Sequence, residues 1–333
     1  MCTHLNPSVR VPDEASGERQ QFDEDVEATA RRLEAKAEGI AGGAEGAALW
    51  SQHEARVSSM ALQLCEQLRL ILEPTQAARL RGDYRTGKRL NMRKVIPYIA
   101  SQFRKDKIWL RRTQASKRTY QILLAVDDSE SMAEAHAGSL ATESIALVTK
   151  ALTLLEAGEV GVVSFGRSTT VLHPFSQPFS EAAGSRVLEH LRFDQQKTDF
   201  ARLLEDATAM FLRARRQTMQ QATALTQLAS PDTAQLLLIL SDGQTHARAK
   251  AVRAAVRAAR AEKIFVVFLV LDARDNKYSF YDVLVYDQGQ MKPLVEEFPF
   301  PFFLVVRDLS TLPDALAQAL RQWFELVTAD ASH

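Results

Sequence analysis

The 333-residue chain contains very little cysteine, since Cys2 and Cys65 are its only two. This excludes a disulfide framework and a thiolate metal site, and it favours a reducing compartment such as the cytosol or nucleus. No apolar run approaches the roughly 20 residues that a membrane-spanning helix needs. Residues 1–25 are polar and acidic, unlike a secretory signal. We therefore expect neither secretion nor a membrane partner.

The chain also lacks an excess of either charge, because Lys plus Arg and Asp plus Glu both number 41. The charges are unevenly placed along the sequence. Residues 13–54 are mostly acidic, whereas residues 79–118 are strongly basic and contain several aromatic side chains. Such a basic segment either binds nucleic acid through phosphate contacts and stacking, docks on an acidic partner or on the acidic N-terminal segment, or is a nuclear-import signal. The sequence alone leaves these alternatives open.

These changes of charge along the sequence predict three segments. Residues 1–48 are expected to be an acidic and flexible N-terminal segment, residues 49–117 a helical and basic extension, and residues 118–330 a folded domain. In the extension, apolar residues recur every three or four positions between Trp50 and Leu72. That spacing is typical of an amphipathic helix with a packing face.

From Tyr120 onward, continuous apolar runs alternate with helical patterns. Such runs are typical of parallel strands that helices cover on both faces. We predict strands at residues 120–126, 159–165, 169–172, 236–240, 264–271 and 302–306. The predicted fold class is therefore α/β, with a doubly wound, mostly parallel sheet. Residues 272–301 interrupt the alternation and are predicted to form a hairpin-like insertion loop.

The most informative motif is Asp-Asp-Ser-Glu-Ser at residues 127–131, directly after the first of these strands. If the chain stays extended there, the side chains of Asp127, Ser129 and Ser131 point to one side. Carboxylate and hydroxyl oxygens at the carboxyl end of a strand suit a small hard cation such as Mg²⁺. Asp128 and Glu130 alternate with these residues, so we expect them to be solvated or to support the site from behind.

Two later residues complete the candidate metal site. Asp242 follows the buried strand 236–240 and faces the same crevice if that strand neighbours the first one. Thr198 precedes a predicted helix, so its hydroxyl is either a metal ligand or the helix N-cap, a role for which Asp199 competes. The same five oxygen donors also accept Mn²⁺ or Ca²⁺.

The charge of this donor set predicts a docking site. Two aspartates balance a divalent ion and the remaining donors are neutral, which leaves a coordination position open to an acidic side chain of a partner. Lys197, Gly243 and His246 adjoin the predicted ligands and are expected to line the partner-binding surface.

The chain shows no catalytic constellation. Residues 82–88 match the first seven positions of a phosphate-binding loop, but Arg89 occupies the eighth position, where Ser or Thr is required. Ser129 has no evident base, so hydrolysis is a poor interpretation. We expect no ATPase site in this chain and no catalytic residues.

The motif Asp127-x-Ser129-x-Ser131, with Thr198 and Asp242 downstream, resembles the metal-ion-dependent adhesion site, or MIDAS, of von Willebrand factor A domains. In that family the serines and threonine bind Mg²⁺, the aspartates act largely through water, and a partner's acidic side chain completes the coordination. The chain departs from the family just before Thr198, where Gln-Gln-Lys replaces the common glycines.

Residues 81–100, 103–112 and 316–327 resemble the midasin family of AAA+ ATPases, which act in ribosome biogenesis. The resemblance implies that this chain is the C-terminal end of such a protein, without the ATPase ring. It implies binding of ubiquitin-like domains of assembly factors on pre-60S particles, in the nucleolus and nucleoplasm, through a partner Glu or Asp. Two alternatives are RNA binding through residues 79–118 and a MIDAS module with another acidic protein ligand.

Overall fold

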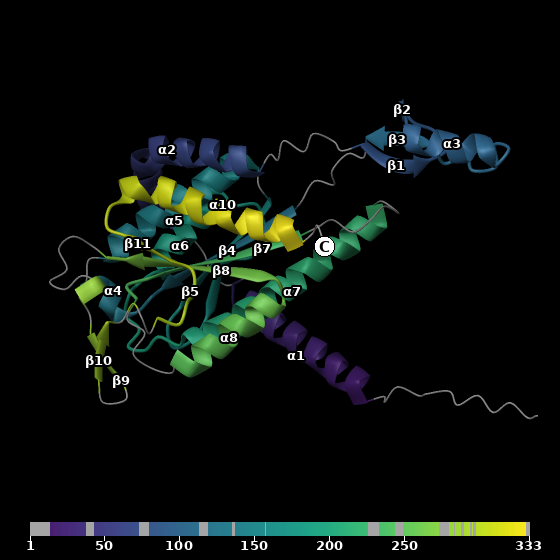
Figure 1. The fold of residues 1–333 in the computed structure, drawn as a ribbon. Coiled ribbons are helices and arrows are strands. Elements are labelled where there is room, and N and C mark those ends of the chain that lie inside the picture. Colours follow the sequence, from purple (N-terminus) through teal and green to yellow (C-terminus); the bar gives the residue numbers. More distant parts are fainter. Residues whose placement is uncertain are drawn as a thin grey trace, which may run out of the picture.

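The computed structural model of this protein describes most of the chain. The described residues are 14–37, 43–72, 80–112, 119–134, 137–156, 158–225, 233–243, 249–272, 280–282, 284–287, 290–293, 295 and 298–330. Two bodies are visible in Figure 1, a large sheet domain with helices on both faces and a small unit at residues 80–112.

The large body is organised by a six-stranded sheet with the strand order β11-β8-β7-β4-β5-β6. Its strands are parallel except β6, which pairs antiparallel with β5. They are β4 (Thr119–Asp127), β5 (Gly158–Phe165), β6 (Thr170–His173), β7 (Thr233–Ser241), β8 (Ile264–Leu271) and β11 (Phe303–Val306). The predicted doubly wound, mostly parallel sheet is confirmed, and its central pair β4 and β7 places residues 127 and 242 at one edge.

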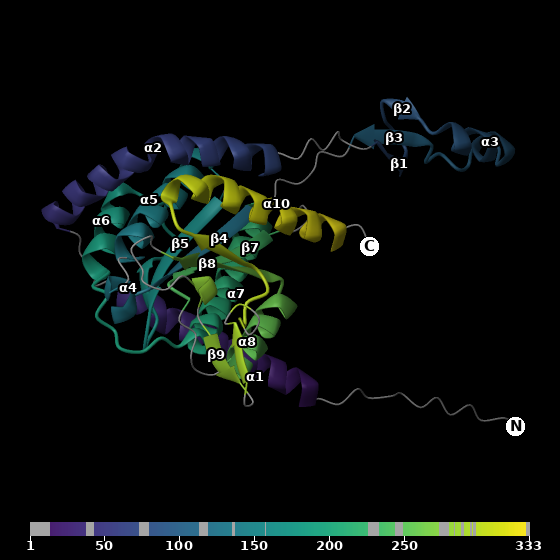
Figure 2. The same ribbon diagram turned by 60° about the vertical axis from the view of Figure 1, so that its left-hand side comes forward.

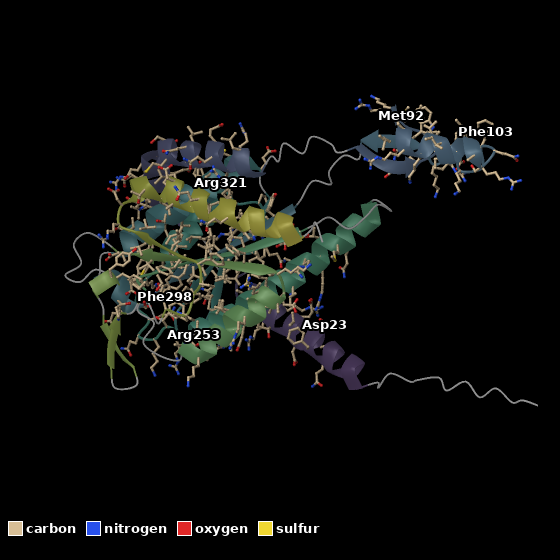
Figure 3. The ribbon with its side chains drawn as sticks, in the orientation of Figure 1. Asp23, Met92, Phe103, Arg253, Phe298 and Arg321 are labelled. Carbon is tan, nitrogen blue, oxygen red and sulfur yellow. The ribbon has the colours of Figure 1, made fainter. Side chains whose placement is uncertain are left out.

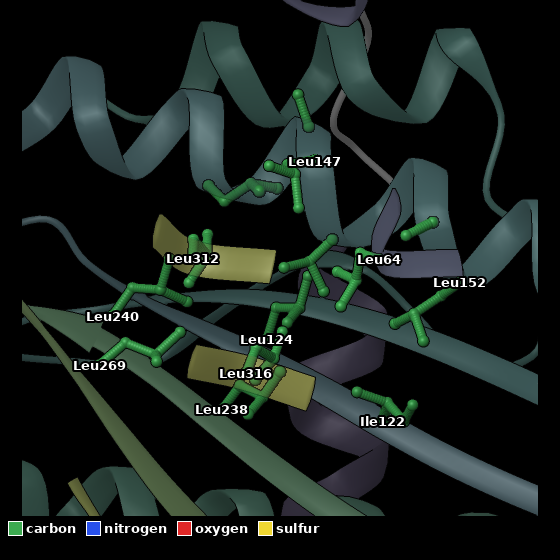
Figure 4. Close-up of a cluster of buried hydrophobic side chains, with 14 of the residues drawn as sticks. Leu64, Ile122, Leu124, Leu147, Leu152, Leu238, Leu240, Leu269, Leu312 and Leu316 are labelled. Atoms are coloured by element: carbon green, nitrogen blue, oxygen red, sulfur yellow. The ribbon is translucent and has the colours of Figure 1, made fainter. Parts of the chain in front are cut away.

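Helices cover both faces of this sheet, as Figures 1 and 2 show from two directions. One face carries α2 (Ala44–Leu72), α5 (Ala137–Leu155), α6 (Glu181–His190) and α10 (Leu312–Asp330). The other carries α1 (Glu14–Ala37), α7 (Phe200–Leu225) and α8 (Ala249–Ala261). Side chains alternate between the faces along each strand, so Leu124 packs in the first layer (Figure 4) and Leu123 in the second.

The acidic N-terminal segment is not simply a flexible tail, because residues 14–37 form α1 and pack on α7. Val26 and Leu33 are buried, and Arg213 of α7 pairs with Glu27 and Glu34 at 3.7 and 3.1 Å. The acidic segment therefore contains a packed helix at residues 14–37, and its acidic side chains pair with cations of a neighbouring helix.

Helix α5 corrects a second expectation. It is long and apolar enough to span a membrane by length and composition, although the sequence was expected to contain no such segment. More than half of that stretch is buried inside the protein, and α5 packs between the sheet and α2. This burial is typical of the core helix of a globular domain.

The predicted helical extension is present as α2, and residues 80–112 form a separate small unit after it. Its strands β1 (Leu80–Tyr84), β2 (Arg89–Leu90) and β3 (Trp109–Arg112) form an antiparallel sheet in the order β1-β3-β2. Helix α3 (Met92–Ala100) connects β2 to β3. These strands have two to five residues, too few to show an alternating pattern in the sequence. Both ribbon views show the unit apart from the sheet domain.

The insertion after β8 contains the predicted hairpin. Strands β9 (Leu284–Asp287) and β10 (Gln290–Pro293) pair antiparallel, after the short 3₁₀ helix η1 (Phe280–Asp282). Phenylalanines anchor the insertion: the Phe280 ring lies 5.3 Å from that of Phe298, and Phe300 lies 4.7 Å from Phe268 of β8. A second 3₁₀ turn, η2 (Leu309–Thr311), leads from β11 into α10.

Candidate metal-binding site

Asp127 lies at the centre of the site, at the carboxyl end of β4, with 1% of its surface exposed. Its Oδ1 accepts the backbone N–H of Ser129 at 3.0 Å, and its Oδ2 accepts the hydroxyl of Ser241 at 2.6 Å. Burial and the nearby Asp242 carboxylate raise the pKa of Asp127 to about 7, against the hydrogen bonds from Ser241 and Ser129. A buried carboxylate with an acidic neighbour is stabilised in its charged form by a cation.

The two serines of the motif lie together, although the chain between them is not extended. Ser129 forms an isolated bridge with Gln195, and helix α4 (Glu130–Glu134) begins at the next residue. The Oγ atoms of Ser129 and Ser131 are 3.0 Å apart. The expected extended backbone is thus wrong, because a helical turn, rather than strand alternation, brings the hydroxyls together.

Thr198 faces the site, and Asp199 takes the role of helix cap. Oδ1 of Asp199 accepts the backbone N–H of Arg202 at 3.2 Å, and α7 begins at Phe200. The hydroxyl of Thr198 lies 3.5 Å from Oδ1 of Asp127. Of the two interpretations of Thr198, the structure therefore excludes the helix N-cap and leaves the metal ligand.

Asp242 follows β7 directly and reaches the site through Ser241. The Ser241 hydroxyl lies 3.5 Å from Oδ1 of Asp242 and 2.6 Å from Oδ2 of Asp127, so it stands between the two carboxylates. Sequence reasoning missed Ser241. The available signal was a hydroxyl residue beside Asp242 at the end of a central buried strand.

Gly243 occupies a position that only glycine fits without strain. Its φ is +82°, and a Cβ there would come within 2.8 Å of the Phe280 ring. The loop after β7 is therefore packed against the start of the 272–301 insertion. Lys197 is exposed beside Thr198, whereas His246 lies outside the described residues.

Asp128 supports the site from behind and is not solvated, which decides between the two roles expected for it. Its Oδ1 accepts the backbone N–H groups of Arg192 and Phe193 at 3.0 and 2.6 Å, and its Oδ2 accepts Nε2 of Gln195 at 3.0 Å. Burial raises its pKa in spite of these bonds. Glu130 is exposed, as expected.

Gln195 joins three loops at this edge of the sheet. Its backbone N–H donates to the Asp128 carbonyl at 3.1 Å, and its own carbonyl accepts from Glu130 N–H at 2.9 Å. Its Oε1 accepts the backbone N–H of Arg167 at 2.9 Å. A side chain at Gly166 would collide with it. Gln195, the first of the three residues that precede Thr198, thus holds the Thr198 loop in place.

The donor set fits a hard divalent cation. Asp127, Ser129, Ser131 and Thr198 converge through the contacts above, and Asp242 lies one residue from Ser241. All of these donors are oxygens, which suit Mg²⁺ better than a soft metal. Within the described ranges, no group of three His, Cys, Asp or Glu residues forms a carboxylate- or imidazole-rich metal cage.

Comparison with curated proteins shows extensive sequence similarity. The chain is 40% identical to midasin from Dictyostelium discoideum over 285 residues, and this aligned stretch is 84% of the chain. The chain is similar to midasin. A second midasin, from Giardia intestinalis, is 36% identical over 282 residues, or 82% of this chain. The predicted resemblance to midasin is confirmed, and the chain spans 5% and 6% of the lengths of these two relatives.

No family model matches the chain. Among solved structures, proximal thread matrix protein 1 from the mussel byssus is 15% identical with a TM-score of 0.41, covering 63% of this chain and 50% of that one. BatB from Bacteroides thetaiotaomicron is 15% identical with a TM-score of 0.36, covering 62% of this chain and 99% of that one. These likenesses are too distant to bear on the site.

Proposed function

We propose that this chain is a Mg²⁺-dependent protein-docking module. Asp127, Ser129, Ser131, Thr198 and Asp242 would hold the ion, which when bound supplies an electrophilic position for a carboxylate of the partner. The observation that supports this best is the convergence of the Ser129 N–H, the Thr198 hydroxyl and the Ser241 hydroxyl on one buried carboxylate, Asp127. The same donors would also accept Mn²⁺ or Ca²⁺.

The electrostatics of the site favour an acidic partner. Two carboxylates balance a divalent cation, and the serine and threonine donors add no charge, so the bound ion would keep affinity for a further anion. Arg167, Arg192 and Lys197 are exposed on the loops around the site. Cations at the rim of an interface speed and orient the approach of an acidic surface.

The similarity to midasin suggests the partner class. We propose that the ligands are ubiquitin-like domains of large-subunit ribosome-assembly factors, each supplying a Glu or Asp to the metal. The module would then couple these factors to an AAA+ ATPase that removes them from pre-60S particles in the nucleolus and nucleoplasm. On this proposal the chain acts by binding and catalyses no reaction. The 40% identity over 84% of the chain is the support for this assignment.

Calorimetry with a purified ubiquitin-like domain of such a factor tests the proposal. Binding is expected in Mg²⁺ and lost in EDTA, and Asp127→Ala should abolish it without unfolding the domain. Glu130→Gln is the matched control, because Glu130 belongs to the same motif but is exposed. A partner variant that lacks the acidic side chain should behave like Asp127→Ala. Unchanged affinity in EDTA would overturn the proposal.

A further inference from the structure

Helix α3 presents an apolar face that nothing in the described structure covers. Met92, Ile96 and Ile99 follow one another at steps of four and three residues, and they are 74%, 75% and 59% exposed. Phe103, just after the helix, is 63% exposed. Residues three and four apart share one side of a helix, so Met92, Ile96 and Ile99 form a continuous stripe, and Phe103 follows the end of the helix. Figure 3 shows Met92 and Phe103 on the small unit, well away from the sheet.

The unit that carries this stripe has almost no core of its own. Across residues 84–110, Ile108 is the one buried side chain. Three short strands and a helix of nine residues gain stability only by burying an apolar face. Here Met92, Ile96, Ile99 and Phe103 are exposed, so burial of the stripe against another molecule would supply the missing core.

The backbone after α3 holds Phe103 in place at a conformational cost. Gln102 and Phe103 have φ values of +54° and +67°, a region that residues other than glycine rarely adopt. Their N–H groups donate to the carbonyls of Ile99 and Tyr98, each at 3.0 Å. The Phe103 ring lies 5.1 Å from the Tyr98 ring, edge to face. This turn places an exposed aromatic side chain just past the end of the helix.

The charge around the stripe has one sign. Asp106 is the only acidic residue between positions 84 and 110, and it pairs with Arg85 at 3.0 Å. The exposed cations are Lys88, Arg89, Arg93, Arg104, Lys105 and Lys107. Two copies of this chain would therefore repel each other across the stripe, whereas an acidic surface would be attracted.

We propose that α3 docks into an apolar groove with an acidic rim on another folded protein. Met92, Ile96, Ile99 and Phe103 enter the groove, and the surrounding cations pair with its rim. This is the recognition of an amphipathic helix by a hydrophobic groove. RNA would engage the cations but would leave the aliphatic stripe without a partner, since isoleucine and methionine neither stack on bases nor donate hydrogen bonds to them. This second surface does not depend on the metal site.

Titration of the full chain with Ca²⁺-loaded calmodulin tests whether α3 docks in an apolar groove with an acidic rim. Calmodulin is the probe because it is acidic and binds amphipathic helices in an apolar groove. We expect binding that weakens with salt. Ile96→Glu should weaken it by about tenfold or more, as for a central interface anchor. Arg104→Gln with Lys105→Gln should weaken it less and reduce its dependence on salt. Leu62→Glu is the matched control, an exposed leucine on α2.

Parallel titrations use poly(U) RNA and vesicles of phosphatidylserine and phosphatidylcholine, and ultracentrifugation measures self-association. Circular dichroism checks that each variant is folded. The proposal is overturned if calmodulin does not bind or if Ile96→Glu binds it as well as the wild-type chain does. It is also overturned if the chain binds RNA, vesicles or a second copy of itself more tightly than calmodulin and Ile96→Glu abolishes that binding.

Discussion

Asp128 and Gln195 fasten together the two loops that carry most of the candidate metal donors. Nε2 of Gln195 donates to Oδ2 of Asp128 at 3.0 Å, and the Gln195 N–H donates to the Asp128 carbonyl at 3.1 Å. Because Asp128 lies between Asp127 and Ser129, these bonds fix the Thr198 loop relative to the serine motif. The donors are held in place by protein contacts before any ion binds.

Replacing Gln195 should therefore weaken metal binding without removing a ligand. Gln195→Ala loses the bonds to Asp128 and to the Arg167 N–H, each contributing about 0.5–1.5 kcal/mol. We expect Mg²⁺ affinity to fall by about tenfold, together with faster amide exchange in residues 191–199. Calorimetry and hydrogen exchange measure these effects. Gln196→Ala is the control, because Gln196 is exposed. Equal Mg²⁺ affinities for the two variants would show that the hydrogen bonds of Gln195 do not contribute to metal binding.

In the metal-free protein, the contribution of Asp127 to stability should fall as the pH rises from 4 to 7. Burial raises its pKa from 3.8 to about 7, so the folded state binds a proton more tightly than the unfolded chain does. The stabilisation is complete below the unfolded pKa and is lost as the pH passes the folded value. Its size is on the order of a few kcal/mol. Urea unfolding in EDTA measures it by difference: between pH 4 and 7 the free energy of unfolding of Asp127→Asn should rise relative to that of the wild-type chain, and parallel curves for the two would contradict it.

His173 should give stability the opposite dependence on pH. Burial lowers its pKa from 6.5 to about 4, helped by the Arg186 charge and opposed by a hydrogen bond with the Gln177 carbonyl. The neutral ring is therefore favoured on folding, and this stability is complete above the unfolded pKa and is lost as the pH falls through 4. The contribution is about 3 kcal/mol.

His173→Gln should lower stability at pH 7 and flatten the dependence between pH 4 and 6.5. Thermal melts across this range measure the effect, with His190→Gln as the control on the neighbouring helix α6. Parallel pH curves for His173→Gln and the wild-type chain would rule out this role for His173.

Gly243→Ala should destabilise the edge of the sheet that carries the site. The new Cβ would meet the Phe280 ring at 2.8 Å, and the φ of +82° disfavours alanine. We expect a loss of about 1–3 kcal/mol in the free energy of unfolding. Adding Phe280→Leu should restore part of the loss by making room. Chemical denaturation checks both variants, and a Gly243→Ala protein as stable as the wild type would contradict this packing.

The sequence predicted the sheet well because its strands are buried on both faces and appear as continuous apolar runs. It also predicted that Asp127 and Asp242 would lie at one edge, since parallel strands end there, whereas the extended backbone expected for Ser129 and Ser131 was wrong. It did not predict α4, because a five-residue helix leaves too short a pattern, and the capping role of Asp199 was only one of two alternatives. The packing of α1 was missed because pairing between Arg213 and Glu34 joins residues far apart in the chain.

The most direct test of the account is a crystal of the full chain soaked with Mn²⁺, whose anomalous scattering locates the ion. The account predicts one ion bound by oxygens of Asp127, Ser129, Ser131, Thr198 and Asp242, directly or through water. A second soak in Mg²⁺ should give ion–oxygen distances of about 2.1 Å. No ion at this edge of the sheet, or an ion held by other residues, would contradict the central claim.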